Sequence, residues 1–155
     1  MSRVYLIRHA HAGDRAKWSG PDDQRPLSDK GWRQARGLVA LLAAEQIDAI
    51  ATSPSLRCAQ TVQPLAGARA LAVDDVDVLL EGHNPREAFA WLEAQAAAGS
   101  IAACSHGDIV PAVLDLAAAA GAALPAERRW QKGSTWVLET EQRRWLSGRY
   151  LPPPD

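Results

Sequence analysis

The sequence has few cysteines, no long apolar run and almost no net charge, and each absence argues against a class of protein. Cys58 and Cys104 are the only cysteines and form no CxxC pair, which disfavours a disulfide framework or a cysteine-built zinc site. No apolar run is long enough to cross a bilayer, so we expect no membrane partner. The formal net charge of −1 gives no general attraction to nucleic acid, and none is expected as a partner.

The chain is long enough to bury one hydrophobic core. It has 155 residues and 47% hydrophobic content, from which we expect a single domain over residues 1–151 and a disordered proline-rich tail over residues 152–155. Met1 is followed almost directly by the apolar segment 4–7, without a basic leader or an apolar signal core. The expected location is therefore the cytoplasm. The sequence carries no signal for an oligomeric state.

Short apolar runs alternate with helical patterns along the chain, which is typical of an α/β fold with a mostly parallel sheet. We predict a three-layer α/β/α sandwich. The predicted strands lie at residues 4–7, 47–52, 70–73, 76–80, 101–104, 134–139 and 143–151, with a tight turn at residues 140–142.

Four helices are predicted between these strands. The first is capped by Ser28 and ends near residue 46, the second runs from the turn at residues 53–55 to about residue 65, the third begins at Asn84, and the fourth covers residues 109–120. The second helix has Arg57 in its first turn. At the third, Asn84 and Pro85 form an N-cap and a helix-starting proline, and Glu87 is expected to close a capping box.

Two segments that follow predicted strands carry groups suited to phosphate chemistry. Arg8 and His9 come directly after the first strand, where a neutral imidazole nitrogen can attack phosphorus and a neighbouring guanidinium disfavours the imidazolium. Arg57, at the start of the second helix, offers a bidentate donor together with the positive end of a helix dipole. Ligands normally bind at this edge of an open α/β sheet.

Two further segments complete the predicted site. His106, after the strand at residues 101–104, is placed to hydrogen-bond phosphoryl oxygens as charge spreads over them. Glu81 follows an apolar run and is a candidate to protonate the leaving group. In the first loop, Arg15, Lys17 and Arg25 are candidates to hold additional phosphates of a nucleotide. Alternatively, they form a solvated basic loop or contact an acidic protein surface.

A metal site is the main chemical alternative. His9 and His11 would project to one side of an extended segment, and His106 with Asp108 would complete a cluster of histidine and carboxylate ligands. Guanidinium groups repel a cation but match a phosphate, so the two arginines favour a phosphate and no metal. A phosphate-binding module without catalytic activity is a second alternative.

The sequence resembles the histidine phosphatase superfamily over nearly its whole length. The resemblance is carried by Arg8-His9 after a strand, Arg57 within residues 53–61, Glu81, and Ser105-His106-Gly107. It implies a phosphoglycerate mutase-like fold and an enzyme without metal or cofactor. It also implies that His9 is the phosphohistidine nucleophile, that Arg8, Arg57 and His106 form the phosphate pocket, and that Glu81 stands where the proton donor usually does.

Two branches of this superfamily are similar in detail. The short chain, with no long insertion between the Arg57 helix and Glu81, resembles the compact SixA-type phosphatases, which implies a protein-borne phosphohistidine as substrate. Residues 12–27 are similar to phosphatase domains fused to some Nudix hydrolases, which implies a nucleotide or another small molecule. A mutase is disfavoured because mutases of this superfamily are longer. Ala10 and His11 depart from the common Arg-His-Gly pattern without removing a catalytic group.

Overall fold

A computed structural model describes residues 1–155 and has six strands in one sheet, in the order β3-β2-β4-β1-β5-β6. The strands are β1 (Ser2–Arg8), β2 (Ala49–Thr52), β3 (Val73–Asp75), β4 (Ile101–Ser105), β5 (Thr135–Glu141) and β6 (Arg144–Leu151). The first four pair in parallel, whereas β5 and β6 add an antiparallel edge next to β1. The predicted α/β class and the mostly parallel sheet are confirmed.

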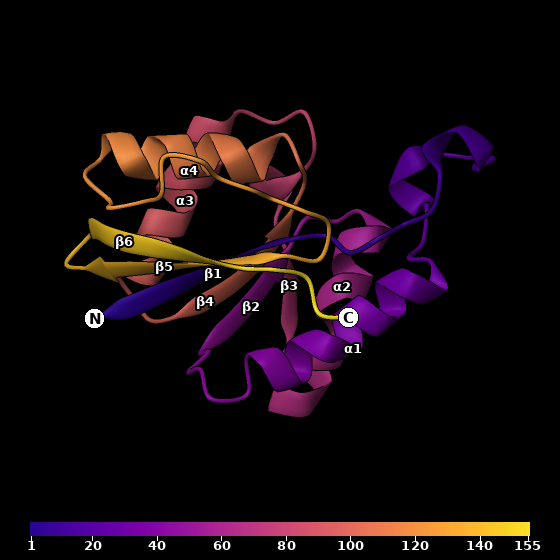
Figure 1. The fold of residues 1–155 in the computed structure, drawn as a ribbon, viewed down its shortest axis with the longest axis horizontal. Coiled ribbons are helices and arrows are strands. Elements are labelled where there is room, and N and C mark those ends of the chain that lie inside the picture. The colour runs from indigo at the N-terminus through magenta and orange to yellow at the C-terminus, as the bar shows by residue number, and fades with distance from the viewer.

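Four α-helices cover the two faces of this sheet. They are α1 (Asp29–Leu41), α2 (Leu56–Arg69), α3 (Pro85–Ala96) and α4 (Ile109–Ala119), and the short 3₁₀ helices are η1 (Arg15–Lys17), η2 (Asp22–Gln24) and η3 (Asp77–Leu79). Figure 1 shows α3 and α4 on one face of the sheet and α1 and α2 on the other. The predicted three-layer arrangement is therefore confirmed. No helix has both the length and the apolar character needed to cross a membrane.

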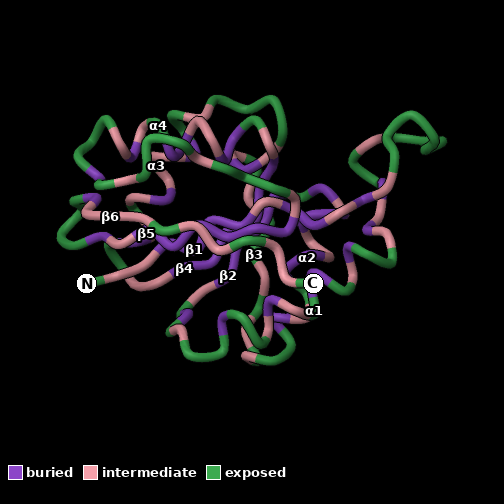
Figure 2. The backbone as a smooth tube through the Cα atoms, in the orientation of Figure 1, coloured by how far each residue is buried: buried purple, intermediate pink, exposed green.

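The central strand β1 is buried because its side chains alternate between the two helical layers. Val4 and Leu6 pack in the core beneath α3 and α4, whereas Tyr5 and Ile7 pack in the core beneath α1 and α2. All four side chains are fully buried, and Figure 2 shows the buried segments concentrated along the central strands. A strand buried on both faces reads as a continuous apolar run, as residues 4–7 do. The residues that follow β1 therefore start from a fixed support.

The strand predicted at residues 76–80 is wrong. Val76 donates its N–H to Thr52 at the end of β2, and the chain then turns into η3, where Leu79 is fully buried in the core. A short apolar run cannot distinguish a strand from a turn that inserts one anchoring side chain. The strand predicted at residues 70–73 lies three residues later, since α2 continues to Arg69 and Ala70 ends it with a φ of +53°.

Other boundaries differ by a few residues. Helix α1 ends at Leu41, because residues 42–45 form turns where the prediction continued the helix to about residue 46. The hairpin turn between β5 and β6 is made by Gln142 and Arg143, both with positive φ, so it lies later than the predicted turn at residues 140–142. Such two-residue turns match the twist of the strands but give a weak signal without glycine or asparagine.

The predicted helix starts at Ser28 and Asn84 are confirmed. The Ser28 hydroxyl accepts a hydrogen bond from Gly31 N–H, and the Asn84 side chain accepts one from Arg86 N–H. The capping box expected from Glu87 does not form, because the Glu87 carboxylate makes no hydrogen bond to the Asn84 backbone. The single bond from Arg86 N–H satisfies the cap without it. At the other end of the chain, the tail packs against α1, where Gly37 leaves room for the ring of Pro154.

Candidate active site

The candidate site lies where β1 and β4 end side by side and the chain leaves them toward opposite faces of the sheet. After β1 the chain continues to α1, and after β4 it continues to α4 on the other face. Open α/β sheets bind their ligands beyond the strand ends at such a change of direction, and we call this position the crevice. Because β1 and β4 pair with Arg8 opposite Ser105, the next residues, His9 and His106, meet there. Their ring centroids are 5.5 Å apart.

His9 is held with one ring nitrogen available for reaction. Its Nδ1 lies 2.8 Å from the Ala10 carbonyl oxygen, which can only accept a hydrogen bond, so Nδ1 carries the proton and Nε2 keeps a free electron pair. Burial lowers the pKa of His9 to about 3, helped by the charges of His106, Arg57 and Arg8 and opposed by the hydrogen bond to Ala10. The imidazole is therefore neutral and nucleophilic at neutral pH.

His106 is fully buried and is oriented from behind by Ser53. The Ser53 hydroxyl oxygen lies 2.8 Å from His106 Nε2 and accepts a hydrogen bond from Ser55 N–H at 3.3 Å. A hydroxyl can accept as well as donate, so this contact allows the His106 proton on either ring nitrogen. Nδ1 lies 3.5 Å from Arg57 Nη2. Arg57 Nη2 can only donate, so Nδ1 accepts this bond and Nε2–H donates to Ser53. An anion that takes over the Arg57 donor would leave Nδ1 free to carry the proton and to donate as well.

Both predicted phosphate-binding arginines lie at this crevice. Arg57 is 1% exposed and comes from the first turn of α2, as predicted, and Arg8 donates from Nη1 to the Trp130 carbonyl at 2.9 Å. Each guanidinium has a buried Nε without an acceptor in the protein. Gly107 packs directly against the Arg8 guanidinium, since an added Cβ there would lie 2.6 Å from Nη2. The two arginines thus retain unused donor capacity beside His9.

A rim of charged side chains from the first loop surrounds Arg57. Asp22 binds Arg57 through its carbonyl oxygen at 2.8 Å and its carboxylate at 3.1 Å, and the same carboxylate pairs with Arg15 and Arg25. Glu81 belongs to the same rim and lies 3.1 Å from Arg15 and 3.8 Å from Arg57, with its side chain 45% exposed. Glu81 is therefore near the site, as predicted, but at its solvent edge.

Hydrogen bonds between elements fix the loops that carry these groups. The Thr61 hydroxyl accepts from Ala10 N–H at 2.9 Å and donates to the Arg57 carbonyl at 2.6 Å, which ties the His9 loop to α2. The loop that follows Glu81 is tied to the start of α4, because Gly82 N–H donates to the Asp108 carboxylate at 2.8 Å.

Two predicted candidates have other surroundings. Lys17 lies on η1 and lines a small cavity of about 230 Å³ within the first loop, together with Trp18. His11 contacts the helix cap, with Nδ1 2.6 Å from the Ser28 hydroxyl. No group of three or more histidine, cysteine, aspartate or glutamate side chains is close enough to hold a metal ion, so the ligand cluster weighed above from His9, His11, His106 and Asp108 does not form.

Three residues near the site were missed by sequence reasoning. Asp22 and Thr61 have no local signal, because their partners come from distant parts of the chain. Lys132 lies on the loop before β5, and its pKa is lowered by burial and by the charges of four site arginines, with Arg8 the strongest of these. A single lysine before a strand is indistinguishable from a solvated one in the sequence.

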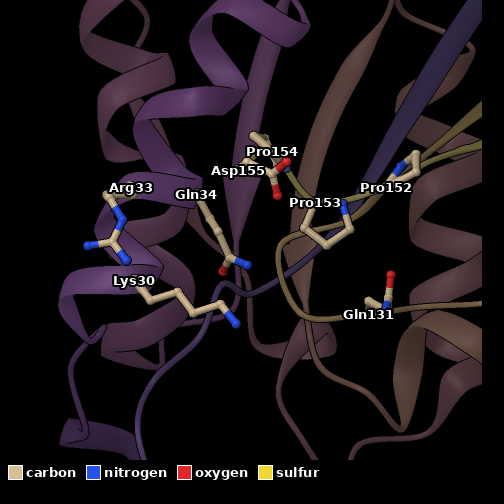
Figure 3. Close-up of a pocket in the computed structure, with 8 residues that line it drawn as sticks. All are labelled: Lys30, Arg33, Gln34, Gln131, Pro152, Pro153, Pro154 and Asp155. Atoms are coloured by element: carbon tan, nitrogen blue, oxygen red, sulfur yellow. The ribbon is translucent and has the colours of Figure 1, made fainter.

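A larger cavity lies between the first two turns of α1 and the C-terminal tail. It has a volume of about 480 Å³. Figure 3 shows Lys30 and Gln34 of α1 on one side and Gln131 with the C-terminal prolines on the other. Gln34 also accepts a hydrogen bond from His11 N–H at 2.9 Å, so this wall supports the chain that leaves His9.

Comparison with known proteins shows the family to which this chain belongs. The sequence model of the histidine phosphatase superfamily (branch 1) matches residues 4–85, which is more than half of the chain. The 8-oxo-(d)GTP phosphatase of Mycolicibacterium smegmatis is 31% identical over 161 aligned residues. That alignment covers 98% of this chain but 48% of the relative, so the chain spans about half the length of the curated relative.

Solved structures are similar over almost the whole chain. A structure from Agrobacterium tumefaciens that bears the name phosphohistidine phosphatase SixA has 26% identity and a TM-score of 0.76, and covers 98% of this chain and 99% of that one. The structure of the protein histidine phosphatase SixA complexed with tungstate has 21% identity and a TM-score of 0.73, with 98% and 96% covered. The superfamily predicted from the sequence is thereby confirmed. The chain therefore belongs to the histidine phosphatase superfamily, and its fold matches that of the two SixA-named structures.

Proposed function

We propose that this chain is a metal-independent phosphatase that transfers the phosphoryl group of its substrate to Nε2 of His9 and then to water. The observation that carries this proposal is the fixed tautomer of His9, whose Nδ1–H is committed to Ala10 while Nε2 remains unprotonated. Arg8, Arg57 and His106 supply the donors for the phosphoryl oxygens. A phosphate needs these groups, whereas a metal ion would be repelled by them.

In the first step, Nε2 attacks phosphorus in line with the leaving group. Arg8 and Arg57 neutralise the phosphoryl oxygens, and the Nδ1–H of His106 donates to the same group. Glu81 or solvent supplies a proton to a leaving oxygen that needs one. The buried, preorganised donors act where charge spreads during transfer, which is the setting in which such groups are most effective.

In the second step, water attacks the phosphohistidine and releases inorganic phosphate. Glu81 accepts the proton of that water, because its carboxylate lies 3.8 Å from Arg57 and is the more exposed of the two nearby carboxylates. The Asp22 carboxylate is closer to Arg57, but it pairs with three arginines. His9 returns to its starting tautomer when the N–P bond breaks. No cofactor is required for either step.

Trapping the intermediate tests the proposal directly. Rapid quenching with ³²P-labelled substrate should yield acid-labile, base-stable phosphate on the protein, and His9→Ala should abolish it. His83→Ala is the matched control, since His83 is exposed. Turnover should survive EDTA. Absence of labelled protein during active turnover of the wild type would refute the covalent route, and binding without turnover would favour the phosphate-binding module.

A phosphohistidine-bearing protein is the first candidate substrate. It is supported by the similarity to the SixA-named structure at 26% identity over 98% of the chain. A nucleotide is the second candidate, and it is supported by the similarity to the 8-oxo-(d)GTP phosphatase and by the arginine-rich rim. Rates on a phosphohistidine protein, a nucleoside diphosphate and a sugar phosphate, compared side by side, distinguish these classes.

A further inference from the structure

Lys132 lies on the loop that leads into β5, and hydrogen bonds hold this loop against the nucleophile. Gly133 N–H lies 3.1 Å from the Arg8 carbonyl and 3.0 Å from the His9 carbonyl, and donates to both. On the other side of Lys132, the Trp130 carbonyl accepts from the Arg8 guanidinium at 2.9 Å. The backbone of Lys132 is therefore fixed next to His9 from both directions.

Lys132 is also the cation of this site that has no acceptor in the protein. It is half-buried and forms no ion pair or side-chain hydrogen bond. The arginines are all engaged: Arg8 with the Trp130 carbonyl, Arg15 with Glu81 and Asp22, Arg25 with Asp22 and the Ala12 carbonyl, and Arg57 with Asp22. Burial and the charges of Arg8, Arg25, Arg15 and Arg57 lower the Lys132 pKa. The bonds of Gly133 and Trp130 place Lys132 beside Arg8 and His9, and the direction of its pKa agrees with that position.

The charges of the side chains around the crevice do not balance one another. Five cationic side chains face two carboxylates, which leaves a surplus of three positive charges, from Arg8, Arg15, Arg25, Arg57 and Lys132 against Asp22 and Glu81. The dianion of a phosphate monoester would neutralise only part of this surplus. A substrate with a second phosphoryl group supplies the remaining negative charge.

We propose that Lys132 binds a second phosphoryl group next to the one that His9 receives, so that the substrate is a phosphoanhydride such as a nucleoside diphosphate. This inference rests on the proposed function, because it assumes transfer to His9. It goes beyond that function by assigning a binding residue for the part of the substrate that leaves. A phosphohistidine protein, which has no second phosphoryl group, would not use Lys132 in this way.

The reaction of a phosphoanhydride fits the position of Glu81. An N–P bond forms at His9 Nε2 while the P–O bond of the anhydride breaks, and the bonding electron pair leaves with the departing phosphate. That phosphate is stable as an anion and needs no proton from the protein in this step, whereas an alkoxide does. Water then cleaves the N–P bond, giving inorganic phosphate and a proton to Glu81 or solvent. Glu81, which is partly exposed and paired with Arg15, can accept this proton without having to protonate a leaving group.

Steady-state kinetics of Lys132→Met with three substrates test the proposal. For adenosine diphosphate and inorganic pyrophosphate, we expect the KM to rise by about tenfold or more, because a charge-assisted contact is lost. For p-nitrophenyl phosphate, which has no second phosphoryl group, kcat/KM should change by less than about twofold. Lys132→Arg should restore much of the loss, since it keeps the charge.

Two controls keep the result interpretable. Arg36→Met removes one positive charge from an exposed position on α1 and should leave KM and kcat unchanged for all three substrates. Thermal unfolding of Lys132→Met and Lys132→Arg checks that both are folded. If Lys132→Met lowers kcat/KM equally for all three substrates, the proposal is wrong, because Lys132 then contacts the transferred group itself. Unchanged kinetics on all three substrates would also overturn it. Failure of the wild type to label His9 would instead refute the underlying phosphatase mechanism.

Discussion

The Asp22 carboxylate lies 3.1 Å from Nη2 of Arg57, and the Asp22 carbonyl accepts from Nη1 of the same guanidinium at 2.8 Å. Asp22, in the 3₁₀ helix η2, thus contacts both terminal nitrogens of the buried Arg57 guanidinium. Partial burial raises the Asp22 pKa, but the hydrogen bond from Arg25 and the charges of Arg57 and Arg15 together hold it below its ordinary value. Asp22 is therefore ionised at neutral pH and competes with an incoming phosphate for Arg57.

Asp22→Asn should consequently strengthen the binding of an oxyanion. The amide keeps the shape of the side chain and leaves the backbone carbonyl bond to Arg57, but it removes the competing charge. We expect the inhibition constant of tungstate to fall by about threefold to tenfold, which corresponds to about 1 kcal/mol. The inhibition constant is measured from the inhibition of p-nitrophenyl phosphate turnover by tungstate.

Asp23→Asn is the matched control for this substitution. Asp23 is the exposed neighbour of Asp22 and forms no ion pair, so tungstate inhibition should be unchanged. If Asp22→Asn weakens tungstate binding, the carboxylate positions Arg57 and does not compete with phosphate, and the expectation is wrong.

The buried neutral His9 should make the fold less stable as the pH falls. Its pKa is about 3 in the folded chain and about 6.5 when unperturbed, so between these values the unfolded chain binds a proton that the folded chain does not. Stability therefore decreases as the pH falls below 6.5, by up to about 1.4 kcal/mol per pH unit. Urea unfolding at pH 7 and pH 5 should show a loss about 1 to 2 kcal/mol larger for wild type than for His9→Gln. His83→Gln should behave like wild type.

The central part of the fold was predictable because the signals are local. Residues 4–7 are buried on both faces and read as a continuous apolar run, and Ser28 and Asn84 cap helices within their own turns. The segment at residues 76–80 misled the prediction because its apolar residues anchor a turn through Leu79. Boundaries failed where one backbone conformation decides them, as at Ala70.

The candidate site was predictable to the extent that its residues follow strands. His9 and His106 could be paired from strand ends alone, because parallel register brings such positions together. The partners that orient them could not, since Ser53 and Thr61 act through contacts across 50 residues or more. The ion pairs of Asp22 could not be predicted for the same reason, because they depend on which arginines the fold brings close to it.

Glu81→Gln should distinguish leaving groups by their need for a proton. An aryl or alkyl phosphate needs more help on departure than a phosphohistidine, whose imidazole leaves more readily. We expect the rate of phosphoryl transfer from the alkyl phosphate glycerol phosphate to His9 to fall by about a hundredfold, and the transfer rate from a phosphohistidine protein to fall much less. Single-turnover measurements isolate the transfer step. Equal losses on both substrates would mean that Glu81 acts mainly in the hydrolysis of the intermediate, or in positioning Arg15.

Gly107→Ala should impair phosphate binding without unfolding the chain. A Cβ at this position would lie 2.6 Å from Nη2 and 2.7 Å from Cζ of Arg8, so the guanidinium must move away from its bond to the Trp130 carbonyl. We expect the KM for p-nitrophenyl phosphate to rise by about tenfold, in keeping with the loss of one charge-assisted contact.

Gly67→Ala provides the contrast, because it makes the same chemical change inside α2. A Cβ at Gly67 meets nothing within 4 Å, so the substitution should raise the free energy of unfolding by about 0.5 to 1 kcal/mol through helix propensity and leave the KM unchanged. Urea unfolding and steady-state kinetics of the two variants separate packing against Arg8 from a general effect of added methyl groups. An unchanged KM in Gly107→Ala would mean that Arg8 does not hold the phosphoryl group in the position proposed here.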